Sequence, residues 1–369
     1  MIINSNDKIS TKQATASVTA MIIGAGILTM TRSTGKEVGT PDIWMSVILG
    51  GMLALTLGFV HVKLSQRFPG ETFFQYSHAI CGKFIGTIIN LAMIALFILL
   101  AGFEARVLAE LVRSFLLYST PLEVLIISFL WVGAYLVAGG LNPLVRIFEL
   151  FSIVMVLILT GILILGLQHF DINNLRPVLS EGIMPVIKGV KSTFLSYLGY
   201  EILLFITGFM KEPQKAMKAM FIGVSIPIFY YIGIAVIVTG VLTLEETLTL
   251  TWPTATFVNS IDYPGGFIEN FQIFFIIAWV LAIYTTFSGA LYIASMGIGQ
   301  IIKKKTSDFI CFLMPVIFLV SMIPDNQARV FEMGDLMGNL WLVVAGIIPL
   351  IMLVVAVIRK KGSVKKANE

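Results

Sequence analysis

Charged side chains are scarce in this sequence. Only 12% of its 369 residues are Asp, Glu, Lys or Arg, whereas 57% are hydrophobic and the mean hydropathy is +0.93. An ordinary soluble domain carries about 25% charged residues. A chain with half that charge cannot cover a water-soluble globule of this size, and the composition also excludes a disordered chain and a nucleic-acid-binding protein. The class that remains is a polytopic integral membrane protein in a lipid bilayer.

Residues that hold metals or carry out catalysis are also few. Two cysteines, Cys81 and Cys311, lie far apart and are typical of inert buried thiols. Three histidines form no HExxH motif, the run Gly24-Ala25-Gly26 lacks the third glycine of a dinucleotide-binding motif, and no P-loop or Ser/His/Asp set is present. We therefore expect no enzyme, no cofactor and no metal. The polar start, MIINSNDKISTKQ, does not read as a signal peptide.

Hydropathy divides the chain into ten spans, because a membrane-crossing helix needs about 20 mainly apolar residues. The predicted spans are about 10–32, 42–62, 83–117, 121–140, 144–168, 185–210, 214–243, 266–302, 306–324 and 337–358. The connections between spans are short, apart from three longer polar segments at about 63–82, 169–184 and 244–265. The fold class we expect is thus all-α, with ten transmembrane helices in one transmembrane domain, 1–369.

Basic residues set the orientation, since cytoplasmic loops are enriched in Lys and Arg. With the N-terminus inside, the inner segments hold seventeen of the 25 basic residues: Lys8, Lys12, Lys63, Arg67, Lys83, Arg146, Lys211, Lys215, Lys218, Lys303, Lys304, Lys305, Arg359, Lys360, Lys361, Lys365 and Lys366. Most acidic residues then lie outside. We expect both termini in the cytoplasm, which an even number of spans also requires.

The two halves of the chain resemble each other. The first span contains Gly24-Ala25-Gly26 and the sixth contains Leu198-Gly199-Tyr200-Glu201, each near mid-membrane. A glycine inside a helix costs about 1 kcal/mol relative to alanine, so both positions are weak. The third and eighth spans are both long, and because five is odd the second half enters from the opposite side. This pattern indicates a five-plus-five inverted repeat, about 10–168 and 185–358, with broken helices 1 and 6 at a binding site.

Glycines also permit close packing between helices, so either glycine site alone could serve packing instead of marking a broken helix. Matching breaks favour unwinding, where free backbone N–H groups receive an anionic group and free carbonyls receive a cation or an ammonium group. The candidate ligand-binding residues at the breaks are Gly24, Ala25, Gly26, Ile27, Leu198, Gly199, Tyr200 and Glu201. Glu201 either pairs with a ligand amine or caps free amides of the broken helix.

Spans 3 and 8 supply further candidates. Phe97 and Ala101, one turn apart in span 3, are expected to form an apolar wall of the same cavity or to pack within the bundle. Thr285 and Ser288 belong to the polar cluster 284–288 in span 8, and such hydroxyls can also bond the carbonyl one turn earlier in their own helix. Glu104 and its neighbour at 106 are expected to be structural or to line a hydrated vestibule, with a proton relay as the alternative.

These residues resemble a known group. The broken first and sixth helices and the ten-span plan are similar to the amino acid–polyamine–organocation permease superfamily, which has the LeuT-like fold. Three short motifs narrow the resemblance to the B subunit of endospore germinant receptors (the spore germination protein family): KISTKQ at 8–13, FPGET at 68–72 followed by an aromatic stretch, and GYE at 199–201. Each motif is short, and their order and spacing over the whole chain carry the match.

The resemblance implies a nutrient sensor in the inner membrane of a dormant spore. It would bind a small-molecule germinant, such as an amino acid, sugar or nucleoside, in a transporter-like pocket between the two breaks. It would signal to an A subunit and a C-subunit lipoprotein to trigger germination. The alternative is a proton- or sodium-coupled amino acid transporter of the same superfamily, with Glu104 and Glu201 as candidate coupling groups.

Overall fold

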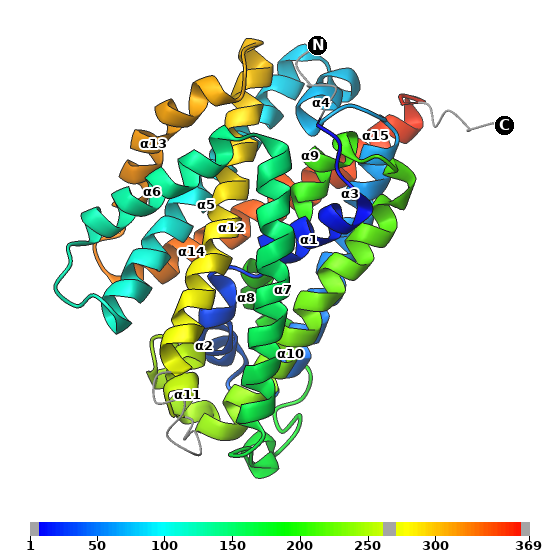
Figure 1. Cartoon of the computed structure of the whole chain (residues 1–369). Helices are drawn as coiled ribbons and strands as arrows, with labels where there is room; N and C mark the ends of the chain where they lie inside the picture. The colour runs from blue at the N-terminus through cyan, green and yellow to red at the C-terminus, as the bar shows by residue number, and fades with distance from the viewer. Residues whose placement is uncertain (1–6, 261–270, 363–369) are drawn as a thin grey trace.

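The computed structural model describes residues 7–260 and 271–362, which are almost entirely helical (Figure 1). The first half contains α1 (Thr11–Ile22), α2 (Gly26–Val38), α3 (Ile43–Gln66), α4 (Phe73–Cys81), α5 (Lys83–Phe115), α6 (Leu122–Ala138), α7 (Leu141–Gly166) and the short 3₁₀ helix η1 (Ile172–Leu175). The second half contains α8 (Met184–Phe194), η2 (Leu195–Tyr197), η3 (Tyr200–Ile202), α9 (Leu203–Ile206), η4 (Thr207–Phe209), η5 (Pro213–Lys215), α10 (Ala216–Thr249), α11 (Pro253–Ser260), α12 (Phe271–Ile302), α13 (Ser307–Ser321), α14 (Gln327–Trp341), the π-helix η6 (Leu342–Ile347) and α15 (Ile348–Ile358).

Six helices of the described chain are long and apolar enough to cross a membrane, and two bent pairs raise the number to eight. The predicted fourth and ninth spans correspond to α6 and α13. These are apolar but have 17 and 15 residues, fewer than the about 20 that a crossing needs. The all-α membrane fold is confirmed, and the count of ten depends on these two short helices.

Both predicted helix breaks are present. The first bent pair is α1 with α2, and its two helices meet at 51°. The second runs from Met184 to Tyr197 and from Tyr200 to Phe209, with a bend of 52°. Two nearly equal bends at matching places confirm that the first and sixth spans are broken.

The two halves of the chain interleave. Helix α1 packs against α7, α10 and α12, and α5 packs along α12. In Figure 1, α1 and α2 lie in the middle of the view, behind α7 and α12. The long third and eighth spans are α5 and α12, with 33 and 32 residues, as the repeat predicts. The first broken helix therefore packs against α10 and α12 of the other half as well as against α7 of its own half.

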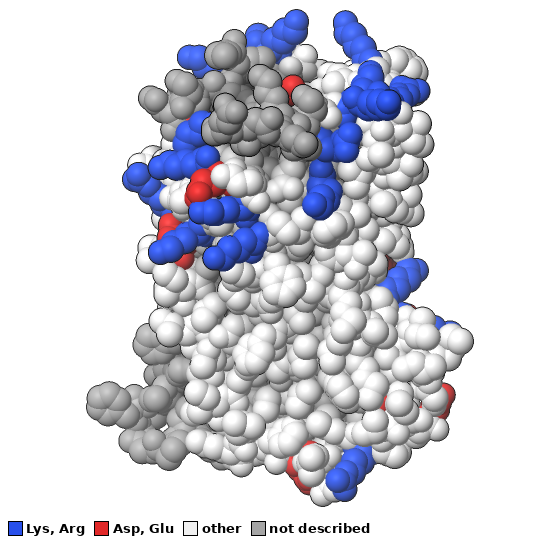
Figure 2. Space-filling view, turned by 90° about the vertical axis from the view of Figure 1, so that its right-hand side faces the viewer, with Lys and Arg blue, Asp and Glu red and all other residues white. Residues whose placement is uncertain are grey.

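The outer surface is suited to lipid. Phe84, Tyr135 and Phe229 are 80%, 86% and 65% exposed, which is the pattern of side chains that face hydrocarbon. Figure 2 shows a middle region nearly free of charge on one face, with Lys and Arg gathered over its upper part. The start of α1 and the end of α15 lie at the same end of the bundle (Figure 1).

Several elements extend beyond the predicted boundaries. Helix α2 continues to residue 38 rather than 32, and α14 begins at 327 rather than 337. The polar segments 63–82 and 244–265 contain helices α4 and α11, and a Thr72–Gln75 capping box starts α4. The predicted beginning of span 8 at 266, the segment 261–265 and the tail Lys365-Lys366 lie outside the described residues.

The final span changes its hydrogen-bonding pattern at the π-helix η6. His61 of α3 is fully buried, and its Nε2 atom lies 2.6 Å from the carbonyl oxygen of Ala345 in η6. The same imidazole ring stacks on Tyr200, with ring centroids 5.2 Å apart. His61 therefore joins the irregular turn of the last span to the break in the sixth, and π-turns of this kind are frequent at functional sites.

Candidate functional site

Helices α7, α10 and α12 surround the first break, and two of them supply partners for its carbonyl groups. The Tyr231 hydroxyl of α10 donates to the carbonyl oxygen of Ile22 at 2.7 Å. Thr285 Oγ1 of α12 donates to the carbonyl oxygen of Ala20 at 3.0 Å, and Thr286 Oγ1 lies 3.3 Å from that of Met21. Carbonyls left free by an unwound helix end must find such donors when they are buried. Hydroxyls of the second half of the chain therefore hold the first break.

The second break is capped from its own segment. Gly199 adopts φ = 127°, a conformation that favours glycine, and its N–H donates to Glu201 Oε2 at 2.8 Å. The other carboxylate oxygen, Oε1, is buried without a hydrogen bond among the described residues. The indole of Trp341 lies beside the carboxylate, but the geometry falls short of a hydrogen bond.

The two breaks touch each other. A Cβ atom placed on Gly199 would lie 2.5 Å from the carbonyl of Met21, and one on Gly26 would lie 2.6 Å from the Cα atom of Ser196. Ser196 Oγ also donates to the carbonyl oxygen of Gly26 at 3.3 Å. Glycine is required at both positions because backbone meets backbone there.

A small cavity of about 20 Å³ lies at this crossing and is called the central cavity below. Its lining comes from both breaks and from α5 and α12: Met21, Ile22, Gly24, Gly26, Leu100, Phe103, Glu104, Leu195, Ser196, Leu198 and Thr286. The Glu104 carboxylate is buried beside the backbone N–H of Ala25, and its Oε2 atom has no hydrogen-bond partner among the described residues. The cavity therefore combines apolar walls with one carboxylate and the backbone of two broken helices.

The structure places the predicted break residues around this cavity in different ways. Gly24, Gly26 and Leu198 line it directly. Ala25 lines a second, larger cavity on the α2 side. The carbonyl of Ile27 accepts a hydrogen bond from the Thr254 hydroxyl at 2.9 Å.

The remaining predicted residues are buried in the surrounding bundle and do not line the central cavity in this structure. Phe97 packs edge-on against Phe205 and Trp341, with centroids 5.3 Å apart in both pairs, and Ala101 lies one turn along α5. The hydroxyl of Tyr200 and that of Ser288 are buried without a hydrogen bond among the described residues.

Sequence reasoning missed several lining residues. Leu100, Phe103 and Glu104 share one face of α5, and a helical face repeats every three to four residues, so extending the stripe from Phe97 could have found them. Thr286 lies within the polar cluster 284–288, from which Thr285 and Ser288 were predicted as candidates. Leu195 and Ser196 carry no comparable signal, because they face the cavity only through the bend between α8 and η3.

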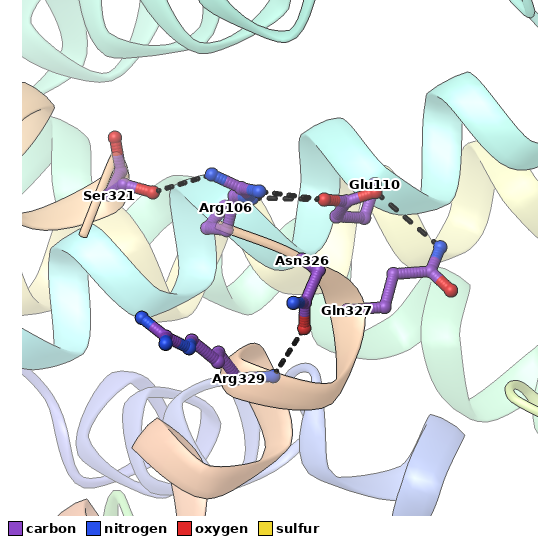
Figure 3. Close-up of polar contacts among 6 residues, drawn as sticks. All are labelled: Arg106, Glu110, Ser321, Asn326, Gln327 and Arg329. Carbon is purple, nitrogen blue, oxygen red and sulfur yellow. Dashed lines mark hydrogen bonds and ion pairs between the residues drawn. The ribbon is translucent and has the colours of Figure 1, made fainter. Parts of the chain in front are cut away.

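A buried ion pair lies on α5 just beyond the residues that line the cavity. Arg106 and Glu110, one turn apart on α5, form an ion pair at 3.0 Å, and Arg106 Nη1 donates to the carbonyl oxygen of Ser321 at 3.2 Å. Gln327, the first residue of α14, reaches Glu110 Oε2 at 3.4 Å (Figure 3). These contacts hold α13 and α14 against the C-terminal part of α5, and breaking one partner of such a buried pair leaves an uncompensated charge.

Two spans broken at mid-bundle, an inverted repeat and a cavity at the crossing define a membrane protein with the LeuT-like transporter fold. Two solved structures share this fold. MhsT in complex with L-phenylalanine matches with a TM-score of 0.68 and 13% identity, covering 94% of this chain and 97% of MhsT. Mhp1, a nucleobase-cation-symport-1 family transporter in a closed conformation with bromovinylhydantoin bound, matches with a TM-score of 0.67 and 15% identity, covering 96% and 81%.

Sequence comparison narrows this class to one family. Residues 8–330 match the spore permease family, described as spore germination protein. The spore germination protein YndE of Bacillus subtilis (strain 168) is 40% identical over 355 residues, which cover 96% of this chain and 98% of YndE. The chain therefore belongs to the spore germination protein family, as the short motifs at 8–13, 68–72 and 199–201 predicted.

Proposed function

We propose that this chain is the nutrient-sensing B subunit of a spore germinant receptor. It binds a small molecule, such as an amino acid, at the crossing of the two broken helices and signals to partner subunits that trigger germination. The observation that carries the proposal is the central cavity, which lies where both breaks meet. Membership of the spore germination protein family supports it, and so does the small molecule bound in both solved structures that share the fold.

The size of the central cavity suggests how binding becomes a signal. A volume of about 20 Å³ has room for little more than one water molecule. A nutrient therefore enters only if the walls separate, and it stabilises the separated arrangement by its differential affinity for that state. Because the walls belong to both breaks and to α5 and α12, ligand occupancy changes the packing of these helices, and a partner subunit in contact with them can detect the change.

We place the protein in the spore inner membrane with both termini in the cytoplasm. Membership of the family supports the spore inner membrane. The cytoplasmic side of the termini rests on the distribution of basic residues and on the end of the bundle that α1 and α15 share. An A subunit and a C-subunit lipoprotein complete the receptor in this proposal. The bilayer surrounds the exposed apolar side chains.

A second candidate function is a coupled amino acid transporter. Glu104 favours it, because a buried carboxylate with one unpartnered oxygen beside the cavity could take up a proton during transport. In this reading, Glu104→Gln abolishes uptake of radiolabelled amino acid driven by a pH gradient in proteoliposomes. In the receptor reading, the wild-type protein accumulates no label under the same gradient.

The central cavity is tested by a matched pair of substitutions in spores that lack the native gene. Leu198→Phe fills the central cavity, whereas Leu157→Phe makes the same change at a side chain that is 66% exposed on α7. We expect Leu198→Phe to raise the nutrient concentration for half-maximal germination by about 10-fold or more, since a single methylene in a tight pocket changes discrimination by about 10–200-fold and phenylalanine adds more than one carbon.

Leu157→Phe should leave the nutrient response unchanged, and immunoblots should show equal amounts of both variants in spore membranes. If Leu198→Phe spores respond like the wild type to every nutrient of an amino acid, sugar and nucleoside panel, the ligand does not bind in the central cavity.

A further inference from the structure

A second cavity lies between α2, α8 and α14, and we call it the outer vestibule. Its volume is about 240 Å³, roughly twelve times that of the central cavity. Phe103 and Leu195 line both cavities and stand between them. A molecule in the vestibule is therefore separated from the central cavity by two apolar side chains. A ligand can therefore bind in the vestibule whether or not a nutrient binds in the central cavity.

Charged groups of both signs surround the vestibule. Arg32, Lys36 and Glu37 come from α2, Lys191 comes from α8, and Asp335 comes from α14. The charge of Asp335 interacts with those of Lys36, Glu37 and Lys191. Yet none of the five forms an ion pair with another, since the ion pairs among the described residues lie elsewhere. Three cations and two anions thus line one cavity, with Arg32 partly buried and the other four exposed.

Two donors deeper in the vestibule also lack partners. Trp252 is 4% exposed, and its indole N–H makes no hydrogen bond among the described residues. The Nε atom of Arg32 is buried and likewise unpaired, while its guanidinium lies 5.0 Å from the ring centroid of Phe331. Trp252 packs on the same ring, with centroids 5.8 Å apart. A buried donor without an acceptor is costly, so a ligand that brings an acceptor would satisfy these groups.

Helix α14 shapes the remaining wall. Phe331, Asp335 and Asn339 follow each other at intervals of four residues, so they form a stripe along one face that lines the vestibule. Gly334 forms part of the neighbouring stripe, where a Cβ atom would lie 3.0 Å from Leu195 and 3.3 Å from Phe103. The small residue lets α14 pack closely against the apolar floor that Leu195 and Phe103 form. The vestibule therefore offers cations and donors, carboxylates and an apolar surface together.

We infer that the outer vestibule binds an α-amino acid with an apolar side chain. The carboxylate would bind the guanidinium of Arg32 and the indole N–H of Trp252, because a planar guanidinium suits a carboxylate. The ammonium group would face Asp335 and Glu37, and the side chain would lie on Phe103 and Leu195. A vestibule with cations alone would suit any anion, whereas charges of both signs select a zwitterion.

Binding of tritiated L-leucine to the purified full-length chain in lipid nanodiscs tests this inference. The Leu198→Phe background weakens binding in the central cavity, so that the saturable binding sensitive to vestibule substitutions reports the vestibule. We expect Arg32→Gln to raise the dissociation constant by about 10-fold or more, and Asp335→Asn to raise it by a smaller factor, because Asp335 is more exposed. Arg329→Gln is the matched control, since Arg329 is exposed and pairs with Asp325 outside the vestibule.

Unlabelled analogues identify the recognised groups. Leucinamide lacks the carboxylate and 4-methylpentanoate lacks the ammonium group, so both should compete at least about 10-fold more weakly than L-leucine. Equal competition by 4-methylpentanoate would show a general anion site and overturn the inference. Absence of saturable binding of L-leucine, L-valine and L-alanine would also overturn it. The same holds if the Arg32→Gln variant elutes as a folded monodisperse protein and binds L-leucine as tightly as the Leu198→Phe background. None of these results depends on a germination response.

Discussion

The two helix breaks are similar in angle but differ in what satisfies their backbone. Hydroxyls from α10 and α12 hold the first break, so its geometry depends on helices of the other half of the chain. The second break is held by Glu201, two residues from the glycine whose N–H it accepts. We conclude that the first break can change when neighbouring helices move, whereas the second behaves as a rigid local unit. The following predictions test this difference.

The largest effect is expected at the rigid break. Gly199→Ala places a Cβ atom 2.5 Å from the Met21 carbonyl and forces alanine to adopt φ = 127°. The unfavourable backbone conformation costs about 1–3 kcal/mol, and overpacking adds about 1–3 kcal/mol. The thermal unfolding midpoint in detergent should fall strongly. Gly161→Ala on α7 is the control, because a Cβ atom there meets nothing within 4 Å; equal midpoints would contradict the rigid contact.

A smaller but specific effect is expected where the first break meets the second. Gly26→Ala would press on the Cα atom of Ser196 at 2.6 Å, whereas Gly24→Ala meets the side-chain oxygen of Thr286 at 2.7 Å, which can rotate away. Gly26→Ala should raise the half-maximal nutrient concentration by about 10-fold or more, and Gly24→Ala by less. Dose–response curves normalised to subunit abundance measure both, and the reverse order would show that backbone contact is not limiting.

Glu201 separates capping from ligand binding. Glu201→Leu leaves the buried N–H of Gly199 without an acceptor, which costs about 1–3 kcal/mol, and should reduce subunit abundance and every nutrient response together. Glu201→Gln keeps an acceptor oxygen and should lose less than Glu201→Leu. Immunoblots beside dose–response curves for an amino acid and a sugar measure this. A loss confined to amine-bearing nutrients at unchanged abundance would assign Glu201 to the ligand instead.

The smallest effect is expected from one anchor of the first break. Tyr231→Phe removes the 2.7 Å hydrogen bond to the Ile22 carbonyl, worth about 1 kcal/mol. If that bond breaks when the central cavity widens, its removal lowers the half-maximal nutrient concentration by about fivefold. Tyr135→Phe, at an exposed position, should change nothing. A Tyr231→Phe response equal to the wild type would show that the first break does not move with α10.

Hydropathy and glycine placement predicted the membrane class, the two breaks and the long third and eighth spans, because apolar length and weak helix positions are local properties of the chain. The first span was predicted to end six residues too early and the last span to begin ten residues too late, for one physical reason. Arg32, Lys36 and Asp335 lower the local hydropathy, but these helices continue with their polar side chains in the outer vestibule rather than in lipid. Hydropathy cannot distinguish the end of a helix from a helix that faces water inside the bundle.

The candidate site was predictable in part. Gly24, Gly26 and Leu198 line the central cavity, and their own sequence pattern pointed to the breaks. Tyr231 was not identified, because its role depends on α10 passing the first break more than 200 residues later in the chain. Contacts of that range follow from the packing of the two halves and leave no periodic pattern in either segment.

The π-helix in the last span has a consequence for how its two parts are aligned. A π-turn accommodates one residue more than an α-turn, and each α-helical residue corresponds to about 100° of rotation. Residues 348–358 are therefore turned by about 100° relative to the face they would present if α14 continued as an α-helix. Deleting one residue between Leu342 and Ile347 would rotate α15 against α3 while leaving the vestibule face of α14 in place. This single π-turn therefore sets which face α15 presents to α3 relative to the face that α14 presents to the vestibule.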